Sequence, residues 1–322
     1  MPGTTSAADV VAGAVAPSTG VARGTEAVAD PELIELGPED LPSVAALLGE
    51  PPAAGSRWVG IVIAGRLVAV AGWVPAGAGV RLLGPSTEPS APVNDEPDTA
   101  DSPCAEADAF AEVLIGAVEE LAAEELSQPL ATIEADAGGE AEAAVLRSLG
   151  YRGVPPLLRR RLPELIAVPT ASAMRSLGRH LAGLFRAGDL VIATGDLGAG
   201  KTTLTQGIGE GLGVDEPVTS PTFVLSRIHP GAHGRPDLVH VDAYRLGDSA
   251  EVDDIDLDHD LDRSVTVIEW GEGLAEQLAD HRLEVDIRRS EDPTDDGRLV
   301  MLRPVGERWD GVRLTPTEGA DQ

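Results

Sequence analysis

The 322-residue sequence predicts an α/β protein with two domains, an α+β domain followed by a domain built on a three-layer α/β sheet. The chain is long enough for two domains that each bury a hydrophobic core. The second half contains short β-branched runs and helical patterns, and two of its strands end in acidic residues, which is typical of an open α/β sheet. The first half has the order strand pair, helix, strand, helix, which indicates a mixed α+β domain.

Composition and pattern set the expected boundaries. We expect a disordered tail over residues 1–30, the α+β domain over 31–165, the α/β domain over 166–295 and a C-terminal segment over 296–322. Residues 85–109 are rich in Pro, Asp, Glu and Ser and lack a packable core. We therefore predict a mobile acidic loop within the first domain.

The α+β domain contains a predicted β-hairpin. Two apolar strands, 58–63 and 66–73, are joined by a turn at Ala64-Gly65. One helix precedes the hairpin, and a helix, a strand and a second helix follow the loop. Their expected ranges are 39–48, 111–126, 130–134 and 140–149.

Charge and composition limit the partners and the cellular setting. The formal net charge is −30, with 24 basic and 54 acidic residues, so the chain lacks the basic surface of a stand-alone nucleic-acid binder. Cys104 is the only cysteine, which excludes an intramolecular disulfide and a four-cysteine zinc site and fits a reducing, cytoplasmic setting. No basic residue precedes the apolar run 10–16, so we expect no secretory signal. We also expect no membrane span, because no stretch reaches the roughly 20 apolar residues that one requires.

The α/β domain is expected to start with a helix capped by Thr170. Apolar residues recur at three- and four-residue steps over 174–185, and Gly188 is expected to end this helix. A buried strand follows over 189–194, and residues 202–208 open a second helix. A glycine-rich loop lies between this strand and this helix.

That loop contains the only lysine of the chain. Residues 195–202 fit the pattern G-x-x-x-x-G-K-[ST], in which loop amides and a lysine bind nucleotide phosphates. A compact ammonium fits between the terminal phosphates and a planar guanidinium does not, which explains why a chain that otherwise uses arginine keeps Lys201. Strand, loop and helix occur in the order of a P-loop NTPase-type sheet, so we predict that a nucleoside triphosphate binds here. The expected nucleotide-binding residues are Asp196, Leu197, Gly198, Ala199, Gly200, Lys201, Thr202, Thr203 and Thr222.

Two acidic residues follow predicted strands of the same domain. Asp242 and Glu269 should converge on the phosphate loop, because ligands bind at the carboxyl edge of open α/β sheets. Mg²⁺ takes few protein oxygens in such sites, and we expect Thr202 and Glu269 to supply them. Lys201, Asp242 and Glu269 are the expected catalytic residues. Asp242 would orient the attacking water or hold a metal-bound water, with a structural cap at the strand end as the alternative.

Three further features keep more than one interpretation. Thr222 follows Pro221 and could sense the γ-phosphate, as switch segments do. Trp270 could face a partner or a base, or it could lie in the core. The acidic run 254–262 lacks the glycine and the distal glutamate of a calcium loop, so a solvated segment is favoured.

Together these motifs resemble one family, TsaE, over roughly residues 168–290. The resemblance rests on four linked motifs, which are residues 195–203, Ser-Pro-Thr-Phe at 220–223, His-Val-Asp-Ala-Tyr-Arg-Leu at 240–246 and Ile-Glu-Trp at 268–270. It implies a P-loop ATPase that uses ATP and Mg²⁺ and works with the transferase TsaD and its companion TsaB. These proteins install the N6-threonylcarbamoyl group on adenosine beside the anticodon of tRNAs that read ANN codons. The resemblance also implies Mg²⁺ ligation by Thr202 and Glu269, a switch-like role for 220–222 and a catalytic role for Asp242.

One departure from the TsaE pattern is visible. The tyrosine that often follows the Thr-Phe motif is absent, and His229 lies near that place. Because the chain is strongly acidic, we expect it to bind tRNA only indirectly, through the partners.

The first domain resembles a GNAT-type N-acetyltransferase through residues 143–151, which are similar to a late helix of that fold. Such enzymes bind the pyrophosphate of acetyl-CoA on a glycine-bearing loop before the central helix. The corresponding stretch here, residues 106–111, is acidic and has no glycine. An inactive or docking domain is therefore favoured over an active acetyltransferase.

Three other functions compete with an ATPase for the second half. A GTPase is excluded because the guanine-reading N-K-x-D element needs a second lysine. A small-molecule kinase is disfavoured because the arginines are scattered and form no recognisable lid. A regulatory module that senses ATP without useful turnover stays open.

Overall fold

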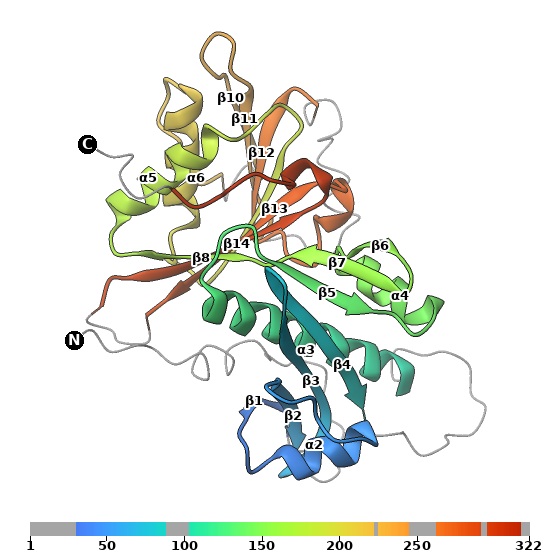
Figure 1. Ribbon diagram of the computed structural model, residues 1–322. Coiled ribbons are helices and arrows are strands. Elements are labelled where there is room, and N and C mark those ends of the chain that lie inside the picture. The colour runs from blue at the N-terminus through green and yellow to red at the C-terminus, as the bar shows by residue number, and fades with distance from the viewer. Residues whose placement is uncertain (1–29, 88–102, 222–224, 245–261, 291–294, 317–322) are drawn as a thin grey trace. The chain divides into compact units, whose positions relative to one another are not determined.

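The computed structural model describes residues 30–87, 103–221, 225–244, 262–290 and 295–316 (Figure 1). The chain forms two compact units. Unit 1 comprises residues 1–126 and 131–162, and unit 2 comprises residues 127–130 and 163–322. Among the described residues, no helix is both long and apolar enough to cross a membrane.

Unit 1 is an α+β domain around one mixed sheet. The strand order of this seven-stranded sheet is β1-β2-β3-β4-β5-β7-β6. All neighbours pair antiparallel except β4 and β5, which are parallel and are connected through helix α3. The elements are β1 Glu32–Leu36, α2 Leu41–Leu48, β2 Arg57–Ile63, β3 Arg66–Ala76, β4 Gly79–Thr87, α3 Pro103–Leu126, β5 Thr132–Asp136, α4 Glu140–Ser148, β6 Arg152–Val154 and β7 Leu157–Arg161.

The hairpin and the predicted helices of unit 1 are confirmed, and the reason for the hairpin turn is local. Ala64 and Gly65 both have positive φ, 52° and 76°, as the tight turns of two-residue β-hairpins require. Helix α3 packs against β2, β3 and β4. Its buried residues Leu114 and Val118 are fully shielded from solvent. The α+β class of the first half is therefore correct.

The acidic loop of unit 1 is shorter than the expected 85–109. Residues 85–87 belong to β4, and α3 begins at Pro103, so the stretch 106–111 lies in a helix. The acidic, alanine-rich residues that lack a core pattern suit a helix N-terminus, where the macrodipole favours negative charge and proline is tolerated. The proposed equivalence of 106–111 to an acetyl-CoA loop is consequently wrong. Residues 88–102 and the tail 1–29 lie outside the described residues.

Unit 2 is an α/β domain with a second seven-stranded sheet, in the order β10-β11-β12-β9-β13-β14-β8. Strands β11, β12, β9 and β13 are parallel, and β10, β14 and β8 pair antiparallel with their neighbours. The elements are β8 Glu164–Val168, α5 Ala171–Ala182, β9 Leu190–Thr194, α6 Lys201–Leu212, β10 Ser226–His229, β11 Asp237–Asp242, β12 Ser264–Glu269, η1 Glu276–Leu278, β13 Arg282–Arg289, β14 Arg298–Val305 and η2 Glu307–Trp309.

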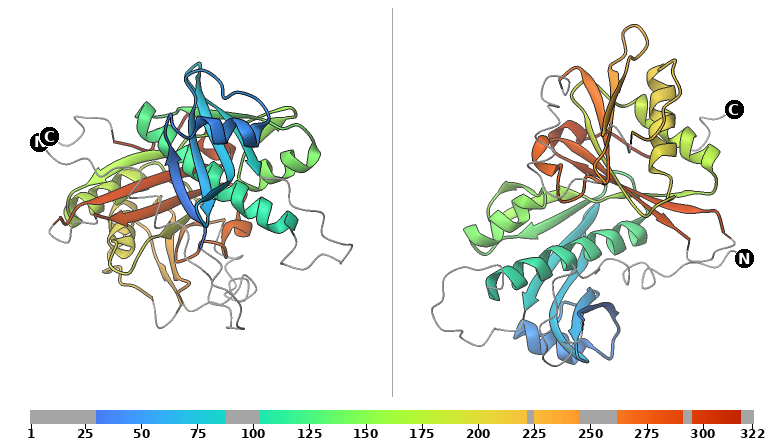
Figure 2. Two further views of the ribbon diagram at one scale, coloured as in Figure 1. Left: turned by 90° about the horizontal axis from the view of Figure 1, so that it is seen from below. Right: turned by 180° about the vertical axis from the view of Figure 1, so that it is seen from behind.

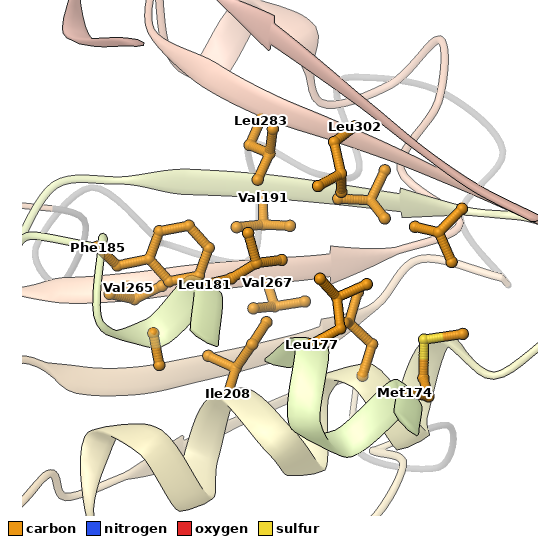
Figure 3. Packing of buried hydrophobic residues seen from close by; sticks show 14 of the residues in the cluster. Met174, Leu177, Leu181, Phe185, Val191, Ile208, Val265, Val267, Leu283 and Leu302 are labelled. Carbon is orange, nitrogen blue, oxygen red and sulfur yellow. The ribbon is translucent and has the colours of Figure 1, made fainter. Parts of the chain in front are cut away.

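The two faces of this sheet bury different partners. Helices α5 and α6 cover one face, and Leu177 and Ile208 pack there against Val191, Val267 and Leu283 (Figure 3). The opposite face buries the alternate residues of the same strands in a smaller cluster against the segment that contains η1. Strands β11, β12, β9 and β13 are parallel, so their carboxyl ends lie at one edge of the sheet. Figures 1 and 2 show α5 and α6 along one face of this sheet.

Two boundaries of unit 2 differ from the sequence prediction. Helix α5 begins as predicted, with the Thr170 side chain accepting a hydrogen bond from the Ala173 amide, but it ends at Ala182 rather than near Gly188. Gly183 caps it, and the apolar pattern that continues beyond the helix comes from Phe185, which packs edge-to-face on Trp309 with ring centroids 6.1 Å apart. The expected C-terminal segment 296–322 contributes β14 and η2 to unit 2, because β14 pairs along its whole length with β13.

Helices α5 and α6 approach each other backbone to backbone through glycines. A Cβ atom at Gly178 would lie 2.4 Å from the Leu204 carbonyl oxygen, and one at Gly207 would lie 2.3 Å from the Arg175 carbonyl oxygen. A Cβ at Gly211 would lie 2.5 Å from that of Ala182. These positions therefore have no space for a side chain, and the phosphate-loop helix is fixed directly on its neighbour.

We predict that Gly178→Ala lowers the free energy of unfolding of unit 2 by about 1–3 kcal/mol, because the added methyl group must push the helices apart. Urea unfolding of the full chain measures this. Gly116→Ala in α3 is the matched control: no atom lies within 4 Å of the added Cβ, and alanine favours a helix. An equal loss of stability in both variants would contradict the backbone-contact explanation.

Candidate functional site

The phosphate loop connects β9 to α6 at the carboxyl edge of the unit 2 sheet. Gly195 and Gly200 have φ values of 124° and 120°, which residues with side chains rarely adopt. A Cβ at Gly195 would also lie 2.2 Å from the Ile287 carbonyl oxygen of β13. Because α6 starts at Lys201 and has no side-chain cap, its first amides have no acceptor within the helix. The start of α6 therefore presents backbone donors without acceptors in the helix, together with the positive end of a helix dipole, which fits a phosphate group.

Lys201 lies buried at the base of this loop. Its Nζ donates hydrogen bonds to the carbonyl oxygens of Gly195 and Asp196, at 2.5 and 3.0 Å. The same ammonium lies 3.6 Å from the centroid of the Trp270 ring. Burial lowers the pKa of Lys201, and the carboxylates of Glu269, Asp242 and Asp196 act in the opposite direction. The loop thus holds the cation that the phosphates would need, bound to neutral acceptors.

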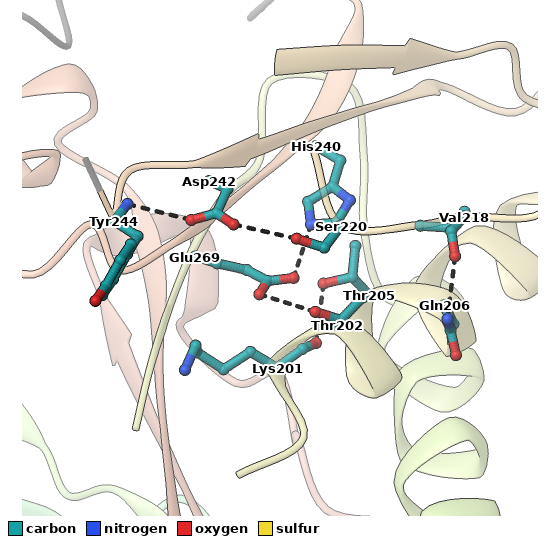
Figure 4. Close-up of polar contacts among 10 residues, drawn as sticks. All are labelled: Lys201, Thr202, Thr205, Gln206, Val218, Ser220, His240, Asp242, Tyr244 and Glu269. Atoms are coloured by element: carbon teal, nitrogen blue, oxygen red, sulfur yellow. Dashed lines mark hydrogen bonds and ion pairs between the residues drawn. The ribbon is translucent and has the colours of Figure 1, made fainter. Parts of the chain in front are cut away.

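Glu269 is held by two donors from different elements (Figure 4). The Thr202 hydroxyl donates to Oε2 at 3.0 Å, and His240 Nε2 lies 2.7 Å from Oε1. Glu269 and His240 are buried, with 3 % and 0 % of their surfaces exposed. This arrangement fixes a hard carboxylate oxygen beside a hydroxyl at the start of α6.

That pair of oxygens fits Mg²⁺ in a nucleotide site. Mg²⁺ uses one or two protein oxygens and completes its octahedron with water and phosphate. In the described part of the chain, no group of three or more His, Cys, Asp or Glu side chains could hold a metal ion by itself. A cation here would accordingly depend on Thr202, Glu269 and a bound nucleotide together.

Asp242 lies beside Glu269 in the paired strands β11 and β12. Its Oδ1 accepts a hydrogen bond from the Tyr244 amide and its Oδ2 accepts one from the Ser220 hydroxyl, both at 3.1 Å. The first contact is the strand-end cap that the sequence left open. The second connects the carboxylate to the segment before Pro221. Asp242 therefore has a structural contact and also faces the site.

The structure brings the predicted residues together, with one outside its described part. The Lys201, Thr202, Asp242 and Glu269 side chains and the loop 196–200 gather at one edge of the sheet. Leu197 is at the exposed tip of the loop, with 84 % of its surface accessible. Thr222 and the acidic run up to residue 261 lie outside the described residues.

Sequence reasoning missed His240 as a site residue. The available signal was the two-residue period of β11, which places His240 and Asp242 on the same face of the strand. Trp270 is half-buried with a φ of 64°, and its ring lies under the Lys201 ammonium, so it faces the phosphate loop rather than the core. His229 is buried, and neither ring nitrogen has a hydrogen-bond partner among the described residues. Burial is the main cause that lowers the pKa of His229, and electrostatic interaction with His240 and Arg227 lowers this pKa further.

Comparisons with known proteins agree on the second half of the chain. The family model described as "Threonylcarbamoyl adenosine biosynthesis protein TsaE" matches residues 168–298. The tRNA threonylcarbamoyladenosine biosynthesis protein TsaE of Streptomyces coelicolor is 58% identical over 138 residues, which cover 42% of this chain and 93% of that protein. The protein of the same name from Mycobacterium tuberculosis is 47% identical over 129 residues, which cover 38% of this chain and 77% of that protein.

Two solved structures each resemble part of the chain. Bacillus subtilis YdiB shares 30% sequence identity, with 46% of this chain and 89% of that chain covered and a TM-score of 0.38. An acetyltransferase of the GNAT family from Novosphingobium aromaticivorans shares 26% identity, with 40% of this chain and 55% of that chain covered and a TM-score of 0.29. The α+β class of unit 1 rests on its own strand order, described above.

We predict that His240→Ala lowers the free energy of unfolding by about 1–3 kcal/mol, because it leaves a buried carboxylate oxygen of Glu269 without its donor. His240→Gln keeps a donor of similar reach and should recover part of this loss. His229→Leu is the control, since it removes a buried ring that makes no recorded hydrogen bond and should cost little or stabilise. Urea unfolding of the variants distinguishes these effects, and a glutamine variant as unstable as the alanine variant would contradict the assigned contact.

Proposed function

Through residues 168–298 the chain belongs to the TsaE family of tRNA threonylcarbamoyladenosine biosynthesis proteins, and on that premise we propose that unit 2 is a Mg²⁺-dependent ATP hydrolase. The observation that carries this proposal is the contact between Thr202 and Glu269 at the mouth of the phosphate loop. A hydroxyl at the start of a helix and a buried carboxylate at a strand end are the two protein oxygens that a P-loop hydrolase needs for its cation.

When the nucleotide binds, the Lys201 ammonium would exchange its hydrogen-bond acceptors. The ammonium donates to loop carbonyls, and phosphate oxygens are stronger acceptors than neutral carbonyls. Transfer of these hydrogen bonds to the nucleotide would neutralise charge on its terminal phosphates. The free amides at the start of α6 would bind the same phosphates from the loop side.

Hydrolysis would require an oriented water and a stabilised leaving group. Mg²⁺, held by Thr202 and Glu269, would neutralise charge that develops on the phosphate oxygens. Asp242 would accept a hydrogen bond from the attacking water; its position beside Glu269, at the same edge as the loop, supports this role. The Ser220 hydroxyl, which donates to Asp242, would orient that carboxylate.

The acidic composition supports a role in which other proteins bind the RNA. Affinity for tRNA comes mainly from Lys and Arg that displace counterions, and this chain has a net charge of −30. We therefore propose that the chain acts with a TsaD-like transferase and a TsaB-like companion, which hold the tRNA. The single cysteine supports a cytoplasmic setting for this assembly.

We propose that unit 1 is a docking domain. Residues 88–102, which precede the helix α3, contain no glycine that would let backbone amides approach the pyrophosphate of acetyl-CoA.

We predict that Lys201→Ala abolishes ATP binding measured by calorimetry while the fold is retained. Lys201→Arg should lower kcat by about tenfold or more, because a guanidinium does not fit between the terminal phosphates. Far-UV circular dichroism controls for the fold of both variants. Wild-type turnover in the arginine variant would refute the explanation for the single lysine.

We also predict that the isolated chain hydrolyses ATP slowly and that a TsaB–TsaD pair raises kcat by about tenfold or more, because partner contacts would position Ser220 and Asp242 at the γ-phosphate. A steady-state phosphate-release assay, with the Lys201→Ala variant and the same partners as background, measures the stimulation. Removal of Mg²⁺ by chelation should abolish it. Equal rates with and without partners, or tight tRNA binding by the isolated chain at physiological salt, would contradict this account.

A further inference from the structure

Two arginines face each other at the hairpin beside the phosphate loop. Arg289 is the last residue of β13 and Arg298 is the first of β14, and the antiparallel register makes them direct partners. Like charges placed directly opposite on neighbouring strands destabilise the pair unless another group compensates. We call Arg289 and Arg298 the rim arginine pair.

The rim arginine pair lacks the carboxylate partner that several other arginines have. Arg179, Arg282 and Arg308 each pair with a carboxylate. Within the described residues, Arg298 instead donates only to the backbone carbonyl oxygens of Ala199, Asp296 and Gly297, and Arg289 has no recorded partner. In a chain with 54 acidic and 24 basic residues, these two adjacent guanidinium groups, to which the described residues offer no carboxylate, leave donors that an anionic ligand could use.

Both side chains lie at the phosphate loop. Arg298 Nε is 3.0 Å from the Ala199 carbonyl oxygen. Arg289 Nη1 is 3.9 Å from the position that a Cβ at Gly198 would occupy. The loop also contacts β13 at Gly195, which packs so closely on the Ile287 carbonyl oxygen that a side chain has no space there.

The Arg298 contact has a geometric effect on the loop. The carbonyl oxygen of Ala199 and the amide hydrogen of Gly200 belong to one planar trans peptide and point in opposite directions. Arg298, which binds the carbonyl oxygen from the β14 side, therefore directs the Gly200 amide away from β14. Because the amides of a P-loop bind phosphate, this contact fixes the direction of one such donor.

We propose that the rim arginine pair is part of the nucleotide site: Arg289 binds phosphate oxygens of the bound nucleoside triphosphate in cis, from the β13 side of the phosphate loop, and Arg298 positions the loop. This inference rests on the proposed ATP-binding function and adds residues to it. A guanidinium suits the role of Arg289 because its planar fork donates two parallel hydrogen bonds to phosphate oxygens. The sequence alone showed only scattered arginines, and no spacing rule relates the two positions that the hairpin register brings together.

The test measures ATP affinity of the full chain by calorimetry, in the presence of Mg²⁺, for wild type, Arg289→Ala and Arg289→Lys. We expect the alanine variant to raise the Kd for ATP about tenfold, the loss typical of one charge-assisted hydrogen-bonded contact, and the lysine variant to retain part of the affinity. Arg235→Ala is the matched control, because Arg235 is exposed on the turn between β10 and β11 and the substitution changes the net charge equally. Its Kd should stay within about twofold of wild type.

The positioning role of Arg298 can be tested by hydrogen exchange in the absence of nucleotide. Arg298→Ala should increase amide hydrogen exchange in the peptide that spans residues 195–203, whereas Arg289→Ala should leave that exchange unchanged. Unchanged loop exchange in the Arg298 variant would overturn the positioning role.

Failure of this inference is distinct from failure of the proposed function. If wild type binds ATP in a Lys201-dependent manner and Arg289→Ala binds it equally well, the rim arginine pair has no binding role. An equal loss in Arg289→Ala and Arg235→Ala would assign the effect to net charge and overturn the inference as well. If wild type itself binds no ATP, the proposed function fails first.

Discussion

The hydrogen-bonded carboxylate of Glu269 is the contact on which the geometry of the site depends. It connects α6 through Thr202 and β11 through His240, while Glu269 itself ends β12. A buried carboxylate is costly unless both oxygens have donors, and here each oxygen has one. The helix that begins at the phosphate loop and the strands that carry the acidic residues are thus held in a common register by one side chain.

The sequence was informative wherever chemistry or turn geometry is local. The loop 195–202, the Thr170 cap and the turn at Ala64-Gly65 each follow from a few adjacent residues, and the structure has them as expected. Lys201 was recognisable because it is the only lysine in the sequence, and a phosphate-binding loop is one of the few places where arginine cannot replace lysine. The carboxylates that follow buried strands could be placed at one edge by the general rule for open α/β sheets.

Features that depend on partners distant in sequence were not predictable. Arg289 and Arg298 become neighbours only through the register of β13 and β14, and the role of His240 depends on β12 lying next to β11. The start of α3 was missed for another reason: its first turns are acidic and rich in alanine, and the absence of apolar residues was interpreted as absence of structure. The position of Phe185 had the opposite effect, since an apolar residue that packs on Trp309 extended the apparent helix beyond Ala182.

The glycine contact between α5 and α6 has a mechanical consequence. Where side chains separate two helices, rotamer changes can absorb small displacements, but Gly178, Gly207 and Gly211 leave backbone against backbone. The two helices must then move as one rigid body. A displacement that a bound nucleotide causes at the start of α6 would also displace the start of α5 near Thr170. A partner that contacts either helix end would then meet a surface whose position depends on the nucleotide.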